Sequence, residues 1–319
     1  MKYKALIGFD INEYPEIEIF QEYFECDFCE YSEDFFKKNI SKYDILVPHL
    51  YLNITSELIN KATKLQYIFT PSTGTNHLDL HAIKKNNINF YCLSDSADFI
   101  SEISSTAELA WLLILAANRK IMNLHKRVLI DKSWKNNDIR GNQLKNKTIG
   151  IIGFGRLGKM IFKYAKSFDM NILIYDTNRS SSHEYENYMK NFDELIKESD
   201  IISLHPKLNE TSHEMINAQS INNMKDGVII INTSRGDVIN SNDLLNSLKS
   251  GKVGFAALDV LKNEFHSGKL PNDPLIEYAL KEDNSDKILI TPHAGGATLD
   301  AHSIVFKHVA YTLKDKIYE

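Results

Sequence analysis

Short apolar runs alternate with helix-forming segments along most of the chain. In the first third, β-branched and aromatic residues gather at 4–9, 44–48, 66–71 and 88–93, and the segments between them, such as 55–64, are amphipathic. This alternation is typical of βα units arranged around a parallel sheet. It predicts one doubly wound α/β domain in the first third of the chain.

A second series of the same kind follows. We expect its strands at residues 148–153, 171–176, 200–205, 227–233, 253–259 and 287–291. Several of these runs are almost wholly apolar, as in strands that helices cover on both faces. The helical region 101–130 connects the two series, and the last helix, 298–317, follows the final strand. We therefore predict an α/β protein with two doubly wound parallel sheets, one formed by residues 1–100 with 297–319 and the other by 101–296.

The composition is that of an ordinary globular protein. The 319 residues include 37 Lys and Arg and 42 Asp and Glu, a net charge of −5, so nothing in the charge favours nucleic acid or an anionic membrane as partner. The most apolar helical stretch, Ala107–Ala117, is shorter than the roughly 20 residues that span a bilayer. The N-terminus MKYKALIGFD lacks the apolar core of a signal peptide. We expect a soluble, cytoplasmic protein with no membrane partner.

Two of the three cysteines, Cys26 and Cys29, form a CxxC sequence. Such a pair can act in redox chemistry or supply half of a metal site. No second CxxC or pair of histidines completes a zinc site, and the segment FECDFCEYS favours a strand over the start of a helix. We expect these cysteines to be structural and predict no metal site.

A glycine-rich turn follows the strand predicted at 148–153. Its sequence is Gly153-Phe154-Gly155-Arg156-Leu157-Gly158, and a helix begins directly after it. Gly153 permits a tight turn, Gly155 allows the backbone to approach a pyrophosphate, and Gly158 allows the helix to pack closely on the strand. The helix N-terminus would present unpaired N–H groups to the phosphates. Strand, glycines and helix in this order predict a dinucleotide-binding unit.

An acidic residue ends the next predicted strand, ILIYD. Asp176 lies 18 residues beyond Gly158, where an acid accepts hydrogen bonds from the adenosine ribose and repels a 2′-phosphate. Arg179 nearby would favour NADP, but an acid at the strand tip outweighs it. The sequence predicts NAD as the cofactor, with NADP the less favoured alternative.

Three polar residues follow the ends of predicted strands in the second half. Arg235 follows 227–233, Glu264 lies five residues past Asp259, and His293 follows 287–291. Reduction of a keto acid needs a group for the carboxylate, which the fork of an arginine suits, and a proton donor for the alkoxide. A histidine beside a carboxylate provides that donor, and the carboxyl ends of parallel strands gather at one crevice. Spacing alone does not exclude an alternative in which Arg235 and Glu264 are surface residues and His293 is structural.

From Leu144 onward the sequence resembles the D-isomer-specific 2-hydroxyacid dehydrogenases. The matching segments are LKNKTIGIIGFGRLGK, MKDGVIIINTSRGDVI, LLNSLKSGKVGFAALDV and ILITPHAGGAT, with looser matches at PSTGTNHLDL and ISSTAELAWLLILAANR. The resemblance implies a flavodoxin-like substrate domain, a Rossmann NAD-binding domain, and hydride transfer between NAD(H) and C2 of a small 2-hydroxy or 2-keto acid. It places the family's catalytic residues on Arg235, Glu264 and His293.

The resemblance also implies binding residues. Backbone N–H groups of Thr73 and Gly74 would join Arg235 in holding the substrate carboxylate. The implied cofactor-binding residues are Gly153, Gly155, Arg156, Leu157, Gly158, Asp176, His205, Pro206, Thr211, Thr233, Ser234, Arg235, Asp259, His293 and Gly296. Such enzymes are usually homodimers joined through the nucleotide-binding domain, and Trp134 resembles an aromatic residue used at that interface.

The sequence departs from the family pattern in several places. The run after His205 is one residue short, Glu102 replaces a common asparagine, Ala294 replaces a larger apolar residue, and the Glu264–His293 stretch is long. An alternative function is an NAD(H)-sensing protein of the corepressor type with little turnover. Formate dehydrogenase, which shares the fold, is disfavoured by Glu264, where its pattern has Gln. The loops around Pro48–Leu52 and Ser72–His77 do not identify the acid, although His49 could contribute to a phosphate site.

Overall fold

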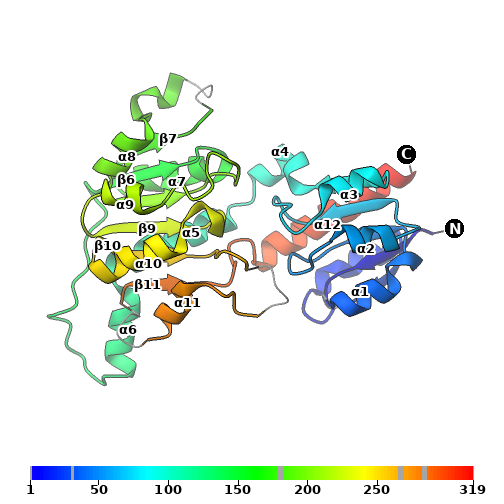
Figure 1. Cartoon of the computed structure of the whole chain (residues 1–319), viewed down its shortest axis with the longest axis horizontal. Helices are drawn as coiled ribbons and strands as arrows, with labels where there is room; N and C mark the ends of the chain where they lie inside the picture. The colour runs from blue at the N-terminus through cyan, green and yellow to red at the C-terminus, as the bar shows by residue number, and fades with distance from the viewer. Residues whose placement is uncertain (1, 30–31, 179–182, 265–268, 282–285, 319) are drawn as a thin grey trace. The chain divides into compact units, whose positions relative to one another are not determined.

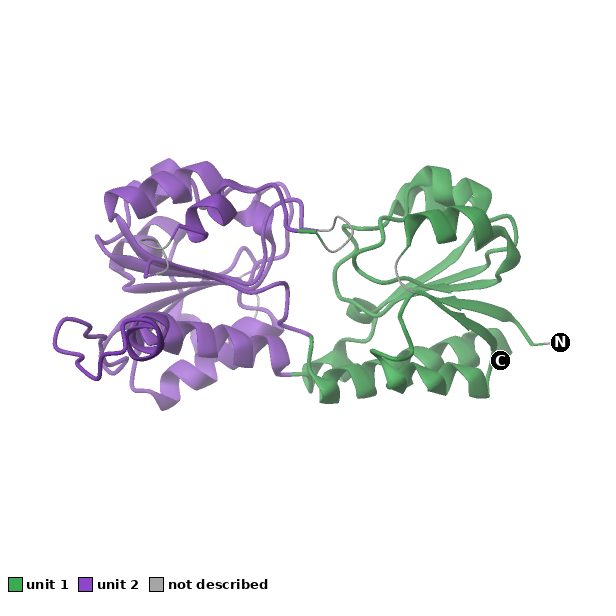
Figure 2. Ribbon diagram, turned by 90° about the horizontal axis from the view of Figure 1, so that it is seen from below, with its two compact units in different colours: residues 1–103, 265–269, 297–319 green, residues 104–264, 270–296 purple. Residues whose placement is uncertain are grey.

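The computed structural model describes residues 2–29, 32–178, 183–264, 269–281 and 286–318. The chain forms two compact units, which Figure 2 distinguishes by colour. Unit 1 is built mainly from Met1–Ile103 and Ala297–Glu319, and unit 2 from Ser104–Glu264 and Leu270–Gly296. Each unit is a parallel α/β structure, which confirms the predicted fold class (Figure 1).

Unit 1 contains a five-stranded parallel sheet with the flavodoxin-like order β2-β1-β3-β4-β5. Its strands are β1 (Lys4–Ile7), β2 (Glu25–Phe28), β3 (Ile45–Val47), β4 (Tyr67–Thr70) and β5 (Asn89–Cys92). Its helices are α1 (Glu33–Asn39), α2 (Ser56–Lys61), α3 (Leu80–Lys85), α4 (Ala97–Ser101) and α12 (Leu299–Tyr318), with 3₁₀ turns η1 (Pro15–Glu22), η2 (Ile40–Lys42) and η3 (Leu93–Asp95).

Alternate residues of the unit 1 strands enter two cores, because successive side chains of a strand point to opposite faces. Leu6 and Leu46 pack in one cluster with apolar residues of α1, α2 and α3. Ala5, Ile7 and Val47 pack in the other cluster with residues of η1 and α12. The last helix of the chain therefore covers one face of a sheet formed by its first residues.

The CxxC cysteines are divided between these two cores. Cys26 packs against the cluster that contains α12, and Cys29 against the cluster that contains α1. Burial is the main cause that raises the pKa of each thiol to about 12. Both thiols therefore stay protonated near neutral pH, which disfavours thiolate chemistry.

Unit 2 contains a six-stranded parallel sheet with the order β11-β10-β9-β8-β6-β7. Its strands are β6 (Thr148–Ile152), β7 (Asn171–Tyr175), β8 (Ile201–Leu204), β9 (Val228–Asn232), β10 (Val253–Leu258) and β11 (Ile288–Ile290). Its helices are α5 (Ser105–Arg119), α6 (Ile121–Leu129), α7 (Arg156–Ser167), α8 (Phe192–Glu198), α9 (Ala218–Asn222), α10 (Ser241–Ser250) and α11 (Pro274–Ala279), with 3₁₀ turns η4 (His183–Tyr188) and η5 (Gly236–Val238).

The strand order of unit 2 reverses at β6. Strand β7 pairs with one side of β6 and β8 with the other, so the loops after β6 and β8 leave the sheet in different directions. In open α/β sheets a ligand binds at such a switch point, outside the carboxyl ends of the strands. This topology predicts a nucleotide site at the loops after β6 and β8.

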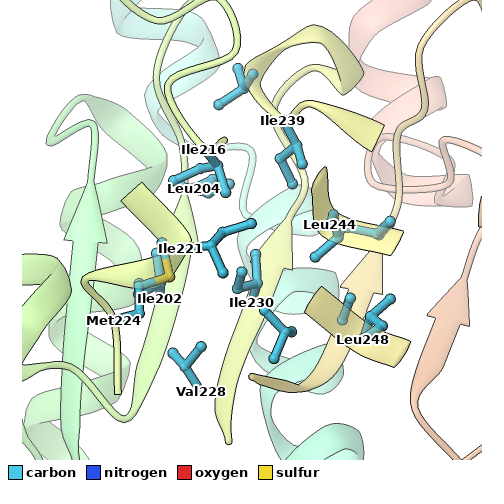
Figure 3. Close-up of a cluster of buried hydrophobic side chains, with 14 of the residues drawn as sticks. Ile202, Leu204, Ile216, Ile221, Met224, Val228, Ile230, Ile239, Leu244 and Leu248 are labelled. Atoms are coloured by element: carbon cyan, nitrogen blue, oxygen red, sulfur yellow. The ribbon is translucent and has the colours of Figure 1, made fainter. Parts of the chain in front are cut away.

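Apolar side chains fill both faces of the unit 2 sheet. Figure 3 shows one face, where Ile202, Leu204 and Ile230 of the strands meet Leu244 and Leu248 of α10. On the other face lies α5, whose Ala107, Ala110 and Ile114 are buried against the sheet. The stretch Ala97–Arg119 has the length and hydropathy of a membrane-spanning helix. In the structure Ala107 and Ile114 of its α5 part pack in a core of unit 2, and Phe99 and Ile100 of its α4 part pack against a core of unit 1.

Candidate active site

The glycine turn after β6 fits tightly into unit 2. Gly153 has φ +88°, and a Cβ there would lie 2.5 Å from the backbone nitrogen of Pro206. A Cβ on Gly158 would collide with the carbonyl of Gly153, so the helix lies directly on the turn. Gly155 is the N-cap of α7, and a Cβ on it would meet nothing within 4 Å. The first and third glycines are thus required by packing, and the second borders open space.

Asp176 is held beside this turn. One of its carboxylate oxygens accepts a hydrogen bond from the backbone N–H of Phe154 at 2.5 Å, and the other from Asn178 at 2.7 Å. The acid that the sequence predicted at the tip of β7 therefore lies next to the glycine turn. Arg179, whose charge would favour NADP, lies outside the described residues. Arg156, in the first turn of α7, is half-buried, and burial lowers the pKa of its guanidinium.

Buried polar atoms lie at the ends of β8 and β9. His205 Nε2 is 2.8 Å from Ser203 Oγ, and burial lowers the pKa of this imidazole to about 4. No described residue forms a hydrogen bond with His205 Nδ1 or with Thr233 Oγ1, although both atoms are buried. Thr211 is exposed, and its hydroxyl donates a hydrogen bond to Asn209 Oδ1. Buried polar atoms usually have partners, so a bound group is expected near His205 and Thr233.

Asn232 shapes the loop that carries Arg235. Its Oδ1 accepts hydrogen bonds from the N–H and the hydroxyl of Ser234, and its Nδ2 donates to the carbonyl of Arg235. Asn232 is fully buried at the end of β9 and was not among the predicted site residues. A polar residue that ends the apolar run VIIIN is the signal that could have identified it. By closing the turn, Asn232 fixes the backbone from which the Arg235 side chain leaves.

Arg235 is half-buried. Its Nη1 donates to the carbonyl of Ser234 at 2.6 Å. Burial lowers the pKa of the guanidinium, and the negative charge of Glu264 opposes that change. The next residue, Gly236, lies so close to the backbone of Leu261 that a Cβ would overlap it. The loops after β9 and β10 are therefore in direct contact.

Asp259 holds the loop that carries His293. The Asp259 carboxylate accepts hydrogen bonds from the hydroxyl of Thr291 and from the backbone N–H groups of Ala294 and Gly295, at 2.5 to 2.8 Å. Its main-chain carbonyl accepts the N–H of His293, whose φ of +52° is left-handed. Burial raises the pKa of Asp259, and these hydrogen bonds oppose the increase. Gly296, next in the loop, is exposed.

Glu264 and His293 form a close pair. His293 Nδ1 lies 2.8 Å from Glu264 Oε1, and Glu264 Oε2 accepts the backbone N–H of Leu261 at 3.0 Å. The side chains are mostly buried, with exposed fractions of 21% for His293 and 11% for Glu264. Unit 2 thus brings together the arginine, the glutamate and the histidine that the sequence singled out. A carboxylate bonded to Nδ1 orients the imidazole ring and determines which of its nitrogens carries the proton.

Thr73 and Gly74 lie in unit 1, in the loop after β4. Thr73 is exposed and Gly74 half-buried. No described residue accepts a hydrogen bond from the backbone N–H of Thr73 or Gly74. The family resemblance predicted that these two N–H groups bind the substrate carboxylate, and consecutive N–H groups that converge can bind anions.

The residues at the carboxyl edge of unit 2 suit a dinucleotide. The open space at Gly155 and the unpartnered atoms of His205 and Thr233 lie at the ends of three neighbouring strands. A twelve-residue helix, α7, begins at the glycine turn. The described residues contain no cluster of three or more His, Cys, Asp or Glu that could hold a metal ion.

Comparison with known proteins agrees with this geometry. Residues 111–295 match the family model of the D-isomer specific 2-hydroxyacid dehydrogenase NAD binding domain. The chain is 33% identical over 304 residues to a hydroxypyruvate reductase of Thermotoga maritima, covering 95% of this chain and 91% of that protein. It is 34% identical over 244 residues to a D-specific alpha-keto acid dehydrogenase of Enterococcus faecium, covering 76% and 72%.

A solved structure extends the similarity to the whole fold. The D-lactate dehydrogenase of Aquifex aeolicus, in complex with NAD and lactic acid, superposes with a TM-score of 0.83 at 27% identity, covering 99% of this chain and 95% of that one. The chain belongs to the D-isomer specific 2-hydroxyacid dehydrogenase family. Within it, this protein is an NAD-dependent oxidoreductase that interconverts a 2-keto acid and a 2-hydroxy acid.

Proposed function

We propose that Arg235, Glu264 and His293 carry the reaction. The 2.8 Å contact between Glu264 and His293 is the observation that supports this assignment best. In reduction, protonated His293 donates its Nε2 proton to the keto oxygen, and Glu264 stabilises the positive charge of the imidazolium. In oxidation, neutral His293 takes the hydroxyl proton. Arg235 is proposed to bind the substrate carboxylate through its fork of N–H groups. The N–H groups of Thr73 and Gly74 in unit 1 are separately proposed as donors to the substrate carboxylate.

The cofactor-binding residues are proposed from the same edge of unit 2. Gly153, Gly155, Arg156, Leu157 and Gly158 would hold the pyrophosphate, and Asp176 the adenosine ribose. His205, Pro206 and Thr211 would lie at the adenine end, and Thr233, Ser234, Asp259 and Gly296 at the nicotinamide end. When bound, the nicotinamide supplies or accepts the hydride at C2. The position of Asp176 beside the glycine turn favours NAD over NADP, because its charge repels a 2′-phosphate.

The substrate is proposed to be a small 2-keto acid without a second anionic group. Unit 1 is assigned as the substrate domain and unit 2 as the NAD-binding domain. The loops that follow β1, β3, β4 and β5, residues 8–14, 48–55, 71–79 and 93–96, contain no Lys or Arg. Burial lowers the pKa of His49 to about 4, so this histidine carries no positive charge at pH 7. A phosphorylated keto acid would find no cation in these loops to pair with its phosphate.

We further propose that the active form is a cytoplasmic homodimer. Helix α6 and the segment after it project from the body of unit 2 (Figure 1). This arm exposes Trp134 to 91%, and also Leu129 and Ile130. Its base is closed by Asn118 and Asn142, which exchange hydrogen bonds. Exposed apolar groups on such an arm are typical of a surface that a second copy of the chain covers in a dimer.

Oxidation of NADH, followed at 340 nm with a panel of 2-keto acids, tests this function. The panel contains glyoxylate, hydroxypyruvate, pyruvate, 2-ketobutyrate, 2-ketoisocaproate and phosphohydroxypyruvate. Turnover is expected with the small members whose only charge is the carboxylate, and not with phosphohydroxypyruvate. His293→Ala should lower kcat by at least ~10²-fold, because general acid catalysis contributes that much. NADH binding without turnover on any member would instead support a nucleotide-sensing role.

A further inference from the structure

A line of side-chain hydrogen bonds lies beneath the loop of Thr73 and Gly74. His77 Nε2 is 3.2 Å from Thr70 Oγ1, which is 3.0 Å from Ser72 Oγ. Ser72 Oγ donates to the carbonyl of Gly74 at 2.7 Å. Thr70 is fully buried at the end of β4, and His77 is 2% exposed. These four residues connect the core of unit 1 to the proposed carboxylate-binding loop.

The direction of each hydrogen bond follows from the number of donors. A carbonyl only accepts, so the single hydrogen of the Ser72 hydroxyl points to Gly74. The contact between the two hydroxyls must then use the hydrogen of Thr70. With that hydrogen committed to Ser72, Thr70 can only accept from His77, so His77 carries its proton on Nε2. The result is one directed chain, His77 to Thr70 to Ser72 to Gly74.

The chain ends on the peptide between Gly74 and Thr75. A peptide group is planar, and in the trans form its N–H points away from its carbonyl. Because Ser72 holds the Gly74 carbonyl inward, the N–H of Thr75 faces the opposite direction. No described residue accepts a hydrogen bond from the N–H of Thr73, Gly74 or Thr75. Three consecutive donors thus remain for a ligand, and the directed chain holds the orientation of the last one.

We propose that His77 is a positioning residue for substrate binding, which acts through Thr70 and Ser72 to fix the N–H groups that bind the substrate carboxylate. This inference rests on the proposed function of the loop and adds Thr75 to its donors. His77 does not touch the substrate in this scheme. Its effect is to preorganise donors, so that binding does not have to order the loop.

The test compares Ser72→Ala, Thr70→Val and the double variant with the wild-type enzyme. The readouts are KM and kcat for hydroxypyruvate, KM for NADH, and the inhibition constant of oxamate, an unreactive analogue of a 2-keto acid. Each single variant should raise KM for hydroxypyruvate and the oxamate constant about fivefold to tenfold, the range of one neutral hydrogen bond. The double variant should also stay near tenfold, because both changes break one chain. Both kcat and the KM for NADH should remain within about twofold.

Two controls make the test specific. Thr70→Ser keeps the hydroxyl and should retain the wild-type constants. Ser101→Ala removes a serine of α4 whose hydroxyl donates to the carbonyl of Asp98 in the same unit, and it should also leave them unchanged. His77→Phe, which removes the first donor of the chain, should raise the same constants as Thr70→Val does. If it does not fold, Ser72→Ala still tests the chain, because Ser72 is only half-buried.

The inference and the proposed function fail in different ways. Wild-type affinity for hydroxypyruvate and oxamate in Ser72→Ala and Thr70→Val overturns the positioning role and leaves the function standing. Multiplying effects in the double variant, near a hundredfold, would show two independent interactions and also overturn it. A wild-type enzyme that neither turns over a 2-keto acid nor binds oxamate overturns both.

Discussion

Nδ1 of His293 lies 2.8 Å from Oε1 of Glu264, and these residues come from the loops after β11 and β10. Two backbone contacts hold the pair in place: Leu261 N–H donates to Glu264 Oε2, and His293 N–H donates to the carbonyl of Asp259. The backbone of His293 in this loop is left-handed, with a φ of +52°. The carboxylate therefore fixes the ring orientation and selects Nε2 as the nitrogen that serves the substrate.

Glu264→Gln should lower kcat for keto-acid reduction by about 10² to 10⁴-fold. The amide keeps the size of the side chain but cannot stabilise an imidazolium, and it can select the wrong tautomer of His293. The pH–rate profile for reduction should also move to lower pH, since the protonated histidine loses its counter-charge. Stopped-flow or steady-state assays between pH 5 and 9 measure both effects.

Glu277→Gln provides the matched control, because Glu277 is exposed on α11 of the same unit. It should retain the wild-type rate and profile. A Glu264→Gln enzyme with the wild-type profile would contradict the assigned role of the carboxylate.

Arg235→Lys should lower kcat/KM for the keto acid by about 10²-fold, with little change in the affinity for NADH. Lysine keeps the charge but loses the planar fork that binds a carboxylate at two points. Arg140→Lys, at an exposed position of unit 2, is the control for the same substitution. A KM that does not rise in Arg235→Lys would remove Arg235 from the proposed carboxylate site.

Asp176→Asn should shift the cofactor preference toward NADPH. The amide can still accept the N–H of Phe154, so the glycine turn should keep its shape, but the charge that repels a 2′-phosphate is gone. We expect kcat/KM to rise about tenfold for NADPH and to fall about tenfold for NADH. Asp226→Asn, whose carboxylate lies on the surface, is the control. Equal use of both cofactors by the wild-type enzyme would contradict the role assigned to Asp176.

The sequence predicted the sheets well because their information is local. Buried strands such as Ile45–Val47 are continuous apolar runs, and the GFGRLG turn requires glycine at Gly153 and Gly158. The sequence could not predict contacts between side chains that are brought together only in the folded chain. The role of Asn232 becomes visible only when the end of β9 meets the Arg235 loop, and the chain from His77 to Gly74 depends on side-chain directions within one turn. Residue spacing does not encode these directions.

Trp134→Glu should convert the protein from a dimer to a monomer, as measured by light scattering after size exclusion. The indole is 91% exposed, and a charge at the centre of an apolar contact costs more than a dimer of modest affinity can tolerate. Phe168→Glu, which places the same charge on a partly exposed aromatic residue at the end of α7, tests whether the effect is specific to the arm. A monomeric wild-type enzyme would contradict the proposed assembly.

His49 should make the protein less stable in mild acid. Burial, and after it the nearby His302, lowers the pKa of His49 from 6.5 to about 4 in the folded state. Between these values the unfolded chain binds more protons than the folded one, so the stability present above pH 6.5 is lost as the pH falls toward 4. The loss of stability from this group can reach about 3 kcal/mol.

His49→Gln removes the titrating group, so the melting temperature of this variant should fall less between pH 7.5 and 5 than that of the wild type. His81→Gln, at an exposed histidine of α3, should follow the wild-type curve, and a His49→Gln curve that also follows it would show that His49 does not control acid stability.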